Sequence, residues 1–135
     1  MKAKIIYMEL IKKYSKNGEI KWIDRYITDD MASLYFSASD VVALPYKSAS
    51  QSGVIPLSYS YNRPVIASDI SGIREMVDHE KTGFLFNRND EKDLSDKIIK
   101  YFNSGIDFKN NIIEFKKRFE WDSFITELLN LSKTL

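Results

Sequence analysis

A loop of small polar residues, residues 48–54, carries the residue types best suited to chemistry in this chain. It reads Ser-Ala-Ser-Gln-Ser-Gly-Val and follows the apolar run of residues 41–46. Backbone N–H groups at the start of a helix bind anions, and small residues let a phosphate approach them closely. We therefore predict that Ser52, Gly53 and Val54 contact a phosphate-bearing ligand, although an ordinary polar loop would also have this composition.

The segments on either side of this loop predict how the fold positions it. Residues 41–44 are predicted to form a buried strand, and Ser52 is predicted to be the N-cap of a helix that ends at Asn62. A second strand is predicted at residues 64–67. Parallel sheets present ligands at the carboxyl ends of their strands, so this order places the loop at a ligand-binding edge.

Arg25, Tyr26 and Tyr46 follow predicted strands at the same edge. An arginine there pairs readily with phosphate, and a tyrosine stacks on a base or bonds to a sugar hydroxyl. Each of the three is about as well explained, taken singly, by chance surface placement.

The remaining polar residues give no further catalytic site. His79 is the only histidine, and we interpret it as a solvated turn residue. Glu75 is interpreted as a helix-surface group or a brace for the loop after Ile66. The sequence has no Walker loop, no glycine-rich dinucleotide motif, no Ser/His/Asp set and no Asp-x-Asp pair. We therefore predict no catalytic residue and no metal ligand in this chain.

Along the rest of the chain, hydrophobic periodicity predicts helices and strands in alternation. Met31, Leu34, Tyr35 and Phe36 are expected to face a sheet, and Asn17-Gly18 to close the first helix. The additional predicted helices cover residues 2–15, 30–38, 73–77, 90–102 and 110–119, with a last helix from residue 120, and the additional strands cover residues 20–24 and 84–86. This alternation predicts an α/β fold, a Rossmann-like open parallel sheet flanked by helices. Since the chain begins inside a helix, we expect the first strand of the sheet to be missing.

Composition is that of one soluble domain. The 135 residues carry 20 Lys+Arg against 19 Asp+Glu and no cysteine. The net charge of +1 gives no indication of nucleic-acid binding. No apolar run is long enough to span a membrane. The lack of cysteine fits a reducing, cytoplasmic setting.

Four blocks of sequence, taken in order, resemble the carboxyl-terminal half of group 1 (family 4) retaining glycosyltransferases of the GT-B fold. The blocks are residues 46–56, 63–69, 72–77 and 81–85, and the resemblance covers about residues 19–90. Enzymes of this family transfer a sugar from a nucleotide donor, often in surface polysaccharide or lipopolysaccharide synthesis.

The resemblance implies roles for individual residues. Ser52, Gly53 and Val54 would meet the donor diphosphate. Arg25 and Tyr26, with Tyr46 and Leu57, would lie along the edge that binds the base and ribose.

The family usually has two glutamates, separated by seven residues, around this loop. They fall here on Ala49 and Leu57, or on Ser50 and Ser58 when counted from Gly53. The second glutamate usually bonds to the donor ribose, and a leucine has no group that does so.

On this resemblance, residues 1–135 are a nucleotide-sugar-binding domain without its amino-terminal acceptor domain. The expected ligand is a UDP- or GDP-sugar, the expected acceptor a glycan or lipid-linked glycan, and no cofactor or metal is implied. The full enzyme is expected in the cytoplasm, with peripheral contact at the inner membrane face through the missing half, and this chain alone is expected not to turn over substrate. A non-catalytic Rossmann-like binding module and, more remotely, a flavodoxin-like signalling domain are the alternatives.

Overall fold

The computed structural model describes residues 2–15 and 18–118 of the chain, with side chains from residue 5 onward. The chain divides into two compact units, Met1–Met31 and Ala32–Leu135, and each is described by itself. The last predicted helix, from residue 120, lies outside the described residues.

The first unit contains helix α1 (Lys2–Tyr14) and an irregular segment. Gly18 has a φ of 76°, in the left-handed region predicted for the chain reversal after this helix. Residues 20–24 were predicted to be a strand, and this prediction is wrong, because they form no ladder. Alternation of apolar residues decides which side chains share a face, but a strand also needs a neighbour to pair with. Trp22 instead stacks on Tyr7 of α1, with ring centroids 5.8 Å apart.

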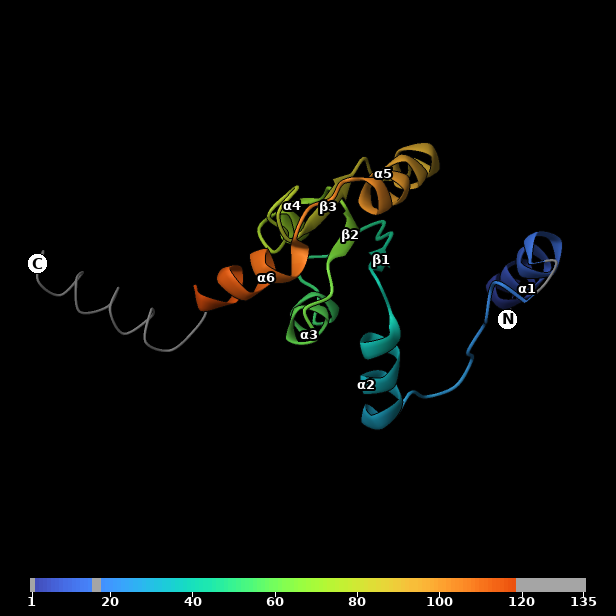
Figure 1. Ribbon diagram of the computed structural model, residues 1–135. Helices are drawn as coiled ribbons and strands as arrows, with labels where there is room; N and C mark the ends of the chain where they lie inside the picture. The colour runs from blue at the N-terminus through green and yellow to red at the C-terminus, as the bar shows by residue number, and fades with distance from the viewer. Residues whose placement is uncertain (1, 16–17, 119–135) are drawn as a thin grey trace, which may run out of the picture. The chain divides into compact units, whose positions relative to one another are not determined.

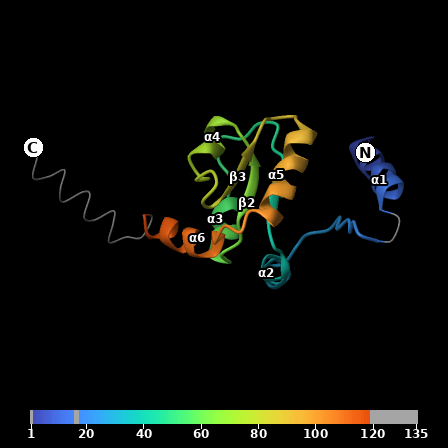
Figure 2. The ribbon, with the colours of Figure 1, turned by 45° about the horizontal axis from the view of Figure 1, so that its top comes forward.

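Within the described residues, the second unit has a parallel three-stranded sheet in the order β1-β2-β3. The strands are β1 (Val42–Leu44), β2 (Val65–Ser68) and β3 (Gly83–Phe86), each within one residue of its predicted bounds. Helices α3 (Val54–Ser60) and α4 (Ser71–Arg74) connect them, and α5 (Glu91–Asn103) and α6 (Phe108–Lys117) follow. Figures 1 and 2 show α5 on one side of the sheet and α3 on the other. The predicted α/β class and parallel order are therefore confirmed.

The core lies on both faces of β2. All four residues of β2 are buried, whereas β1 is buried only at Leu44. Ile55 of α3, Ile73 of α4 and Ile112 of α6 are almost completely inaccessible. A central strand covered on both faces has a continuous apolar sequence, which explains why residues 64–67 were easily recognised.

Helix α2 (Asp29–Ala38) differs from its prediction. Leu34 and Tyr35 are 66% and 42% exposed, so they do not face the sheet as expected. Phe36 is half-buried and stacks on Tyr61 at 5.6 Å between ring centroids. Arg63 donates from Nε to the Phe36 carbonyl (3.0 Å) and from Nη2 to the Ser37 carbonyl (2.5 Å), at the helix end where carbonyls lack helical partners. The helix is therefore held by its end and by Phe36, while Leu34 and Tyr35 of its predicted apolar face stay exposed.

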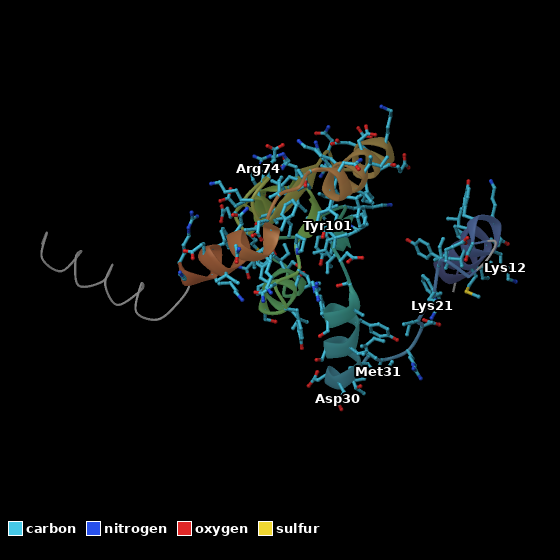
Figure 3. The ribbon with its side chains drawn as sticks, in the orientation of Figure 1. Lys12, Lys21, Asp30, Met31, Arg74 and Tyr101 are labelled. Carbon is cyan, nitrogen blue, oxygen red and sulfur yellow. The ribbon has the colours of Figure 1, made fainter. Side chains whose placement is uncertain are left out.

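Two polar caps explain where the later helices begin. Asp90, one of two residues (with Asn89) that the sequence offers as the cap, accepts from the N–H of Asp93 at 2.9 Å and starts α5. Asp107 accepts from the N–H of Asn110 at 3.1 Å and starts α6 two residues earlier than predicted. Tyr101 of α5 donates to the Asp40 carbonyl (2.9 Å), which fastens α5 to the approach of β1 (Figure 3). Helix α4 also starts two residues before its predicted position and ends at Arg74.

Candidate functional site

The three strands end at one edge of the sheet, because all of them are parallel. The loop of residues 45–53 leaves β1, a short turn at Asp69 and Ile70 leaves β2, and residues 87–90 leave β3. The fold therefore gathers these connections, as the sequence predicted for residues 48–54.

The loop after β1 is held by a pair of hydroxyl groups. The Tyr46 hydroxyl lies 2.9 Å from Ser52 Oγ, and Ser52 Oγ accepts from the N–H of Val54 at 3.2 Å. Ser52 is only 6% exposed. Tyr46, predicted to lie near the ligand, thus also fixes the loop that carries the predicted phosphate contacts.

Helix α3 begins one residue later than predicted. Gly53, and not Ser52, is the N-cap, and no side chain bonds to the helix from the cap position. Ser52 Oγ nevertheless accepts from the first helical N–H, that of Val54. The N–H groups of Gly53 and Ile55 lie at a helix start, where helical geometry provides no partner.

Gly53 is exposed and Val54 is half-buried. A Cβ built on Gly53 would have no atom within 4 Å, and its φ of −69° is ordinary for any residue. Close packing within the protein therefore does not require glycine here.

The turn after β2 touches the loop directly. A Cβ built on Gly72 would lie 1.9 Å from the carbonyl oxygen of Ser50. Only a glycine lets the backbone of α4 approach the loop this closely. The sequence analysis placed Gly72 within a family block but did not predict this contact. The only feature in the sequence that indicated it was a single glycine beside a polar turn.

Asp69 and Arg74, the charged residues on either side of this turn, form an ion pair at the surface. Arg74 Nε donates to Asp69 Oδ1 at 2.6 Å, and this carboxylate raises the pKa of Arg74 (Figure 3). Glu75 is exposed at the end of α4.

His79 has a structural contact in addition to its exposure. Its Nδ1 accepts from the N–H of Leu85 at 2.9 Å, and its ring packs edge-on against Phe84. This histidine therefore covers part of β3, so the interpretation as a solvated turn residue was incomplete.

The predicted base and ribose residues divide between the two units. Arg25 and Tyr26 belong to the first unit, where Arg25 Nη2 contacts Met31 Sδ at 3.8 Å and Tyr26 is 84% exposed. Leu57 lies on α3 and is 40% exposed. Of the predicted site residues, the structure brings Tyr46 into contact with Ser52. The ligand-binding roles of Arg25, Tyr26, Tyr46 and Leu57 stay predictions.

Two observations on the described residues concern metals and membranes. They contain no cluster of three or more His, Asp or Glu side chains arranged to hold a metal ion. No helix among them has the length and apolar character needed to cross a bilayer.

Comparison with known proteins gives the family. The description "Glycosyl transferases group 1" matches residues 6–104, which is most of the chain. The chain belongs to the group 1 glycosyl transferase family. The four blocks that suggested this family from sequence all lie inside the matched range.

Relatives of the family agree with this assignment. The uncharacterized glycosyltransferase MJ1178 of Methanocaldococcus jannaschii is 29% identical over 125 residues, which are 89% of this chain and 35% of the relative. The chain therefore spans about a third of the length of this relative.

Solved structures share the fold of the chain. HepE of Anabaena, in complex with UDP-glucose, superposes with a TM-score of 0.71 at 19% identity, over 98% of this chain and 37% of HepE. Sucrose-phosphate synthase from Thermosynechococcus elongatus gives a TM-score of 0.74 at 20% identity, over 95% of this chain and 33% of the synthase. These likenesses confirm the predicted GT-B type of architecture.

Proposed function

We propose that this chain is the donor-binding part of a glycosyltransferase that uses a nucleotide-sugar donor. The observation that carries the proposal is the family match, which includes the loop at the carboxyl edge of the sheet. Support comes from HepE, which shares the fold and whose structures hold UDP or UDP-glucose. Residues 1–135 would be the carboxyl-terminal domain, and an amino-terminal domain would bind the acceptor.

The loop after β1 would bind the donor diphosphate. The N–H groups of Gly53 and Ile55 are donors at a helix start, where an anion is favoured by the partial positive charge. As the sugar leaves, negative charge grows on the diphosphate, and fixed donors stabilise this charge without reorganising. Ser52 would act by holding the loop in this shape, since its own hydroxyl is already bonded to Tyr46.

The finer parts of the proposal concern the acceptor and the cell. The acceptor would be a glycan or lipid-linked glycan in surface polysaccharide synthesis. The full enzyme would work in the cytoplasm, with membrane contact through its other domain. We propose that donor binding needs no metal, so EDTA should leave the affinity for UDP unchanged.

Calorimetry with UDP, GDP and their glucose or mannose derivatives tests the proposal. At least one diphosphate should bind, and Gly53→Trp should abolish this binding. Gly53 suits this test because a Cβ at this position meets no atom within 4 Å, so we expect a large side chain to leave the fold intact. If no diphosphate binds, or if Gly53→Trp binds as well as the natural chain, the loop does not hold the donor phosphate.

Leu57 tests the ribose contact. Leu57→Glu restores the carboxylate that the family usually has, and the position is exposed enough to accept it. The variant should bind a nucleoside diphosphate more tightly, while Leu34→Glu, an exposed leucine on α2, should not change the affinity.

A second candidate is a binding module of the same fold without chemistry. The leucine at position 57 favours it, because the usual ribose partner is absent. Joining the chain to an acceptor domain and assaying sugar transfer separates the two: binding without transfer in every such protein would favour the module.

A further inference from the structure

Strand β3 lies at one edge of the sheet, since the described residues place β2 on one side of it and no strand on the other. Alternate residues of a strand direct their backbone groups to opposite sides. Phe86 faces β2, because its carbonyl accepts from the Asp69 N–H at 2.7 Å. Leu85 and Asn87 therefore direct their N–H groups away from the sheet, along an edge that is open to pairing with another strand.

Two side chains accept hydrogen bonds from these outward N–H groups. His79 Nδ1 accepts from Leu85 at 2.9 Å, and Asp93 Oδ2 accepts from Asn87 at 2.7 Å. His79 belongs to the turn before β3, and Asp93 belongs to the first turn of α5. The edge is thus covered by one imidazole and one carboxylate, which gain a proton in different pH ranges.

The bond to Leu85 depends on the protonation state of His79. An imidazole nitrogen accepts a hydrogen bond only while it carries no proton, so the bond requires a neutral ring with its proton on Nε2. The charged ring has a proton on both nitrogens, and its Nδ1–H would face the Leu85 N–H. Imidazole groups change charge between about pH 5 and pH 8, so acidification within this range removes the bond.

The surroundings of His79 give the charged ring another partner and room to reach it. Glu80 Oε1 lies 3.9 Å from Nε2 and also accepts from Lys100 of α5. A cavity of about 740 Å³ lies beside the ring, so the ring can turn into open space. Besides Asp93, the charged residues that line this cavity are Asp69 and Arg74, which pair with each other, and Glu75, Asp78, Lys97 and Arg118.

Asp93 keeps its charge over the pH range in which an imidazole titrates. The N–H of Asn87 and, less strongly, the ammonium of Lys97 hold the pKa of Asp93 below its usual value, against the opposing effect of burial. An ordinary aspartate gains its proton near about pH 4, so the bond from Asn87 should persist at pH 5. The two N–H groups on one strand edge should therefore respond differently to acid.

We propose that His79 is a pH-sensitive switch on the outer edge of β3, whose protonation releases the Leu85 N–H while Asp93 keeps hold of the Asn87 N–H. The edge is closed at neutral pH and opens at Leu85 alone in mild acid. The switch consists of contacts within the second unit, so it does not rest on the proposed donor binding.

Amide hydrogen exchange of the ¹⁵N-labelled full chain, followed by NMR between about pH 7.5 and pH 5, tests this proposal. The measured quantity is the protection factor of each amide, which removes the intrinsic effect of pH on exchange. Protection of Leu85 should fall about fivefold to tenfold, as expected for one hydrogen bond, while Asn87 stays protected. Constant protection of Leu85, or an equal fall at both amides, would overturn the proposal.

The ring signals of His79 provide a second measurement, because this chain has a single histidine. At neutral pH the ¹⁵N shifts should identify the form protonated at Nε2. The change in Leu85 protection should have the same midpoint as the titration of the ring. A different midpoint would assign the Leu85 change to another group and would contradict the switch.

Two variants at this exposed position separate the switch from a general effect of acid. In His79→Asn, the amide oxygen takes about the place of Nδ1 and does not titrate, so Leu85 should stay protected at both ends of the pH range. In His79→Ala, the acceptor is missing, so protection of Leu85 should be low throughout. If Leu85 in His79→Ala is still protected at neutral pH and loses this protection in acid, His79 is not the switch.

Discussion

The loop after β1 and the turn after β2 meet at the same edge of the sheet, yet they are held in opposite ways. The loop is fixed by the half-buried Tyr46 and the buried Ser52, and its glycine, Gly53, faces open space. The turn is fixed by its glycine, Gly72, which lies against the Ser50 carbonyl, and its Asp69–Arg74 pair is at the surface. Two glycines nineteen positions apart thus have different surroundings: Gly72 allows close backbone packing, and Gly53 faces the open space where we propose that the donor phosphate binds.

Gly72→Ala should have the largest effect. Its methyl group would overlap the Ser50 carbonyl, and backbone atoms do not move aside as a flexible side chain would. We expect a loss of about 3 kcal/mol or more in the free energy of unfolding, at the upper end for overpacking. Urea unfolding followed by circular dichroism measures it. A loss near zero would mean that the two segments are not in contact in solution.

High pH should loosen α3, the helix into which the loop runs. Burial raises the pKa of Tyr59 to about 12, its bond to Thr82 opposes this rise, and the charge of Asp78 adds to it. Since the unfolded phenol ionises near pH 10, stability is intact below that pH and is lost as the pH rises toward 12. The total loss should be about 2 to 3 kcal/mol.

The measurement is the free energy of unfolding between pH 9 and pH 12, compared with Tyr59→Phe. Other tyrosines also titrate, so the difference between the two proteins isolates Tyr59. Tyr59→Phe loses the bonds to the Met76 carbonyl (3.1 Å) and Thr82 (2.8 Å) at neutral pH, and its pH dependence should be shallower. Parallel pH curves would contradict the assignment.

Ser52→Ala should have an intermediate effect on stability. It removes the acceptor for the Val54 N–H and the partner of the Tyr46 hydroxyl, at a cost of about 1 to 2 kcal/mol. In a double-mutant cycle with Tyr46→Phe, the two losses should not add, because both variants remove the same bond. Full additivity would show that the hydroxyl pair does not hold the loop.

Gly53→Ala should have the smallest effect on stability. It should raise the stability slightly and lower the affinity for UDP. Its φ of −69° and open surroundings accept a methyl group, so stability should rise by up to about 1 kcal/mol through the unfolded state. UDP affinity, measured by calorimetry, should fall. Loss of stability comparable to that of Gly72→Ala would remove the contrast between the two glycines.

Much of this architecture could be predicted from local pattern. The buried strands around residues 42–44, 65–68 and 83–86 were located within one residue, since continuous apolar runs bounded by turn residues are typical of covered parallel strands. The start of α5 was predicted at Asn89 or Asp90, because a short polar side chain at a cap position bonds to nearby N–H groups, and Asp90 is the one that does so. The family, too, was recognised from linear blocks of residues, and the comparisons confirm it.

Predictions that depended on a distant neighbour failed. Residues 20–24 alternate like a strand but pair with no strand among the residues that the structure describes, and Leu34 and Tyr35 of α2 are apolar but exposed. In each case the local pattern was correctly read, and the packing partner was not available from the sequence.

The amino-acid sequence by itself determined the order of strands, loops and helices in the second unit, the family, and the small polar loop where a phosphate is proposed to bind. Tertiary structure alone decided that Gly72 meets Ser50 and that Ser52 bonds to Tyr46. The physical reason is range: periodicity and capping act within a few residues, whereas close approach and hydrogen-bond satisfaction depend on segments that only folding brings together.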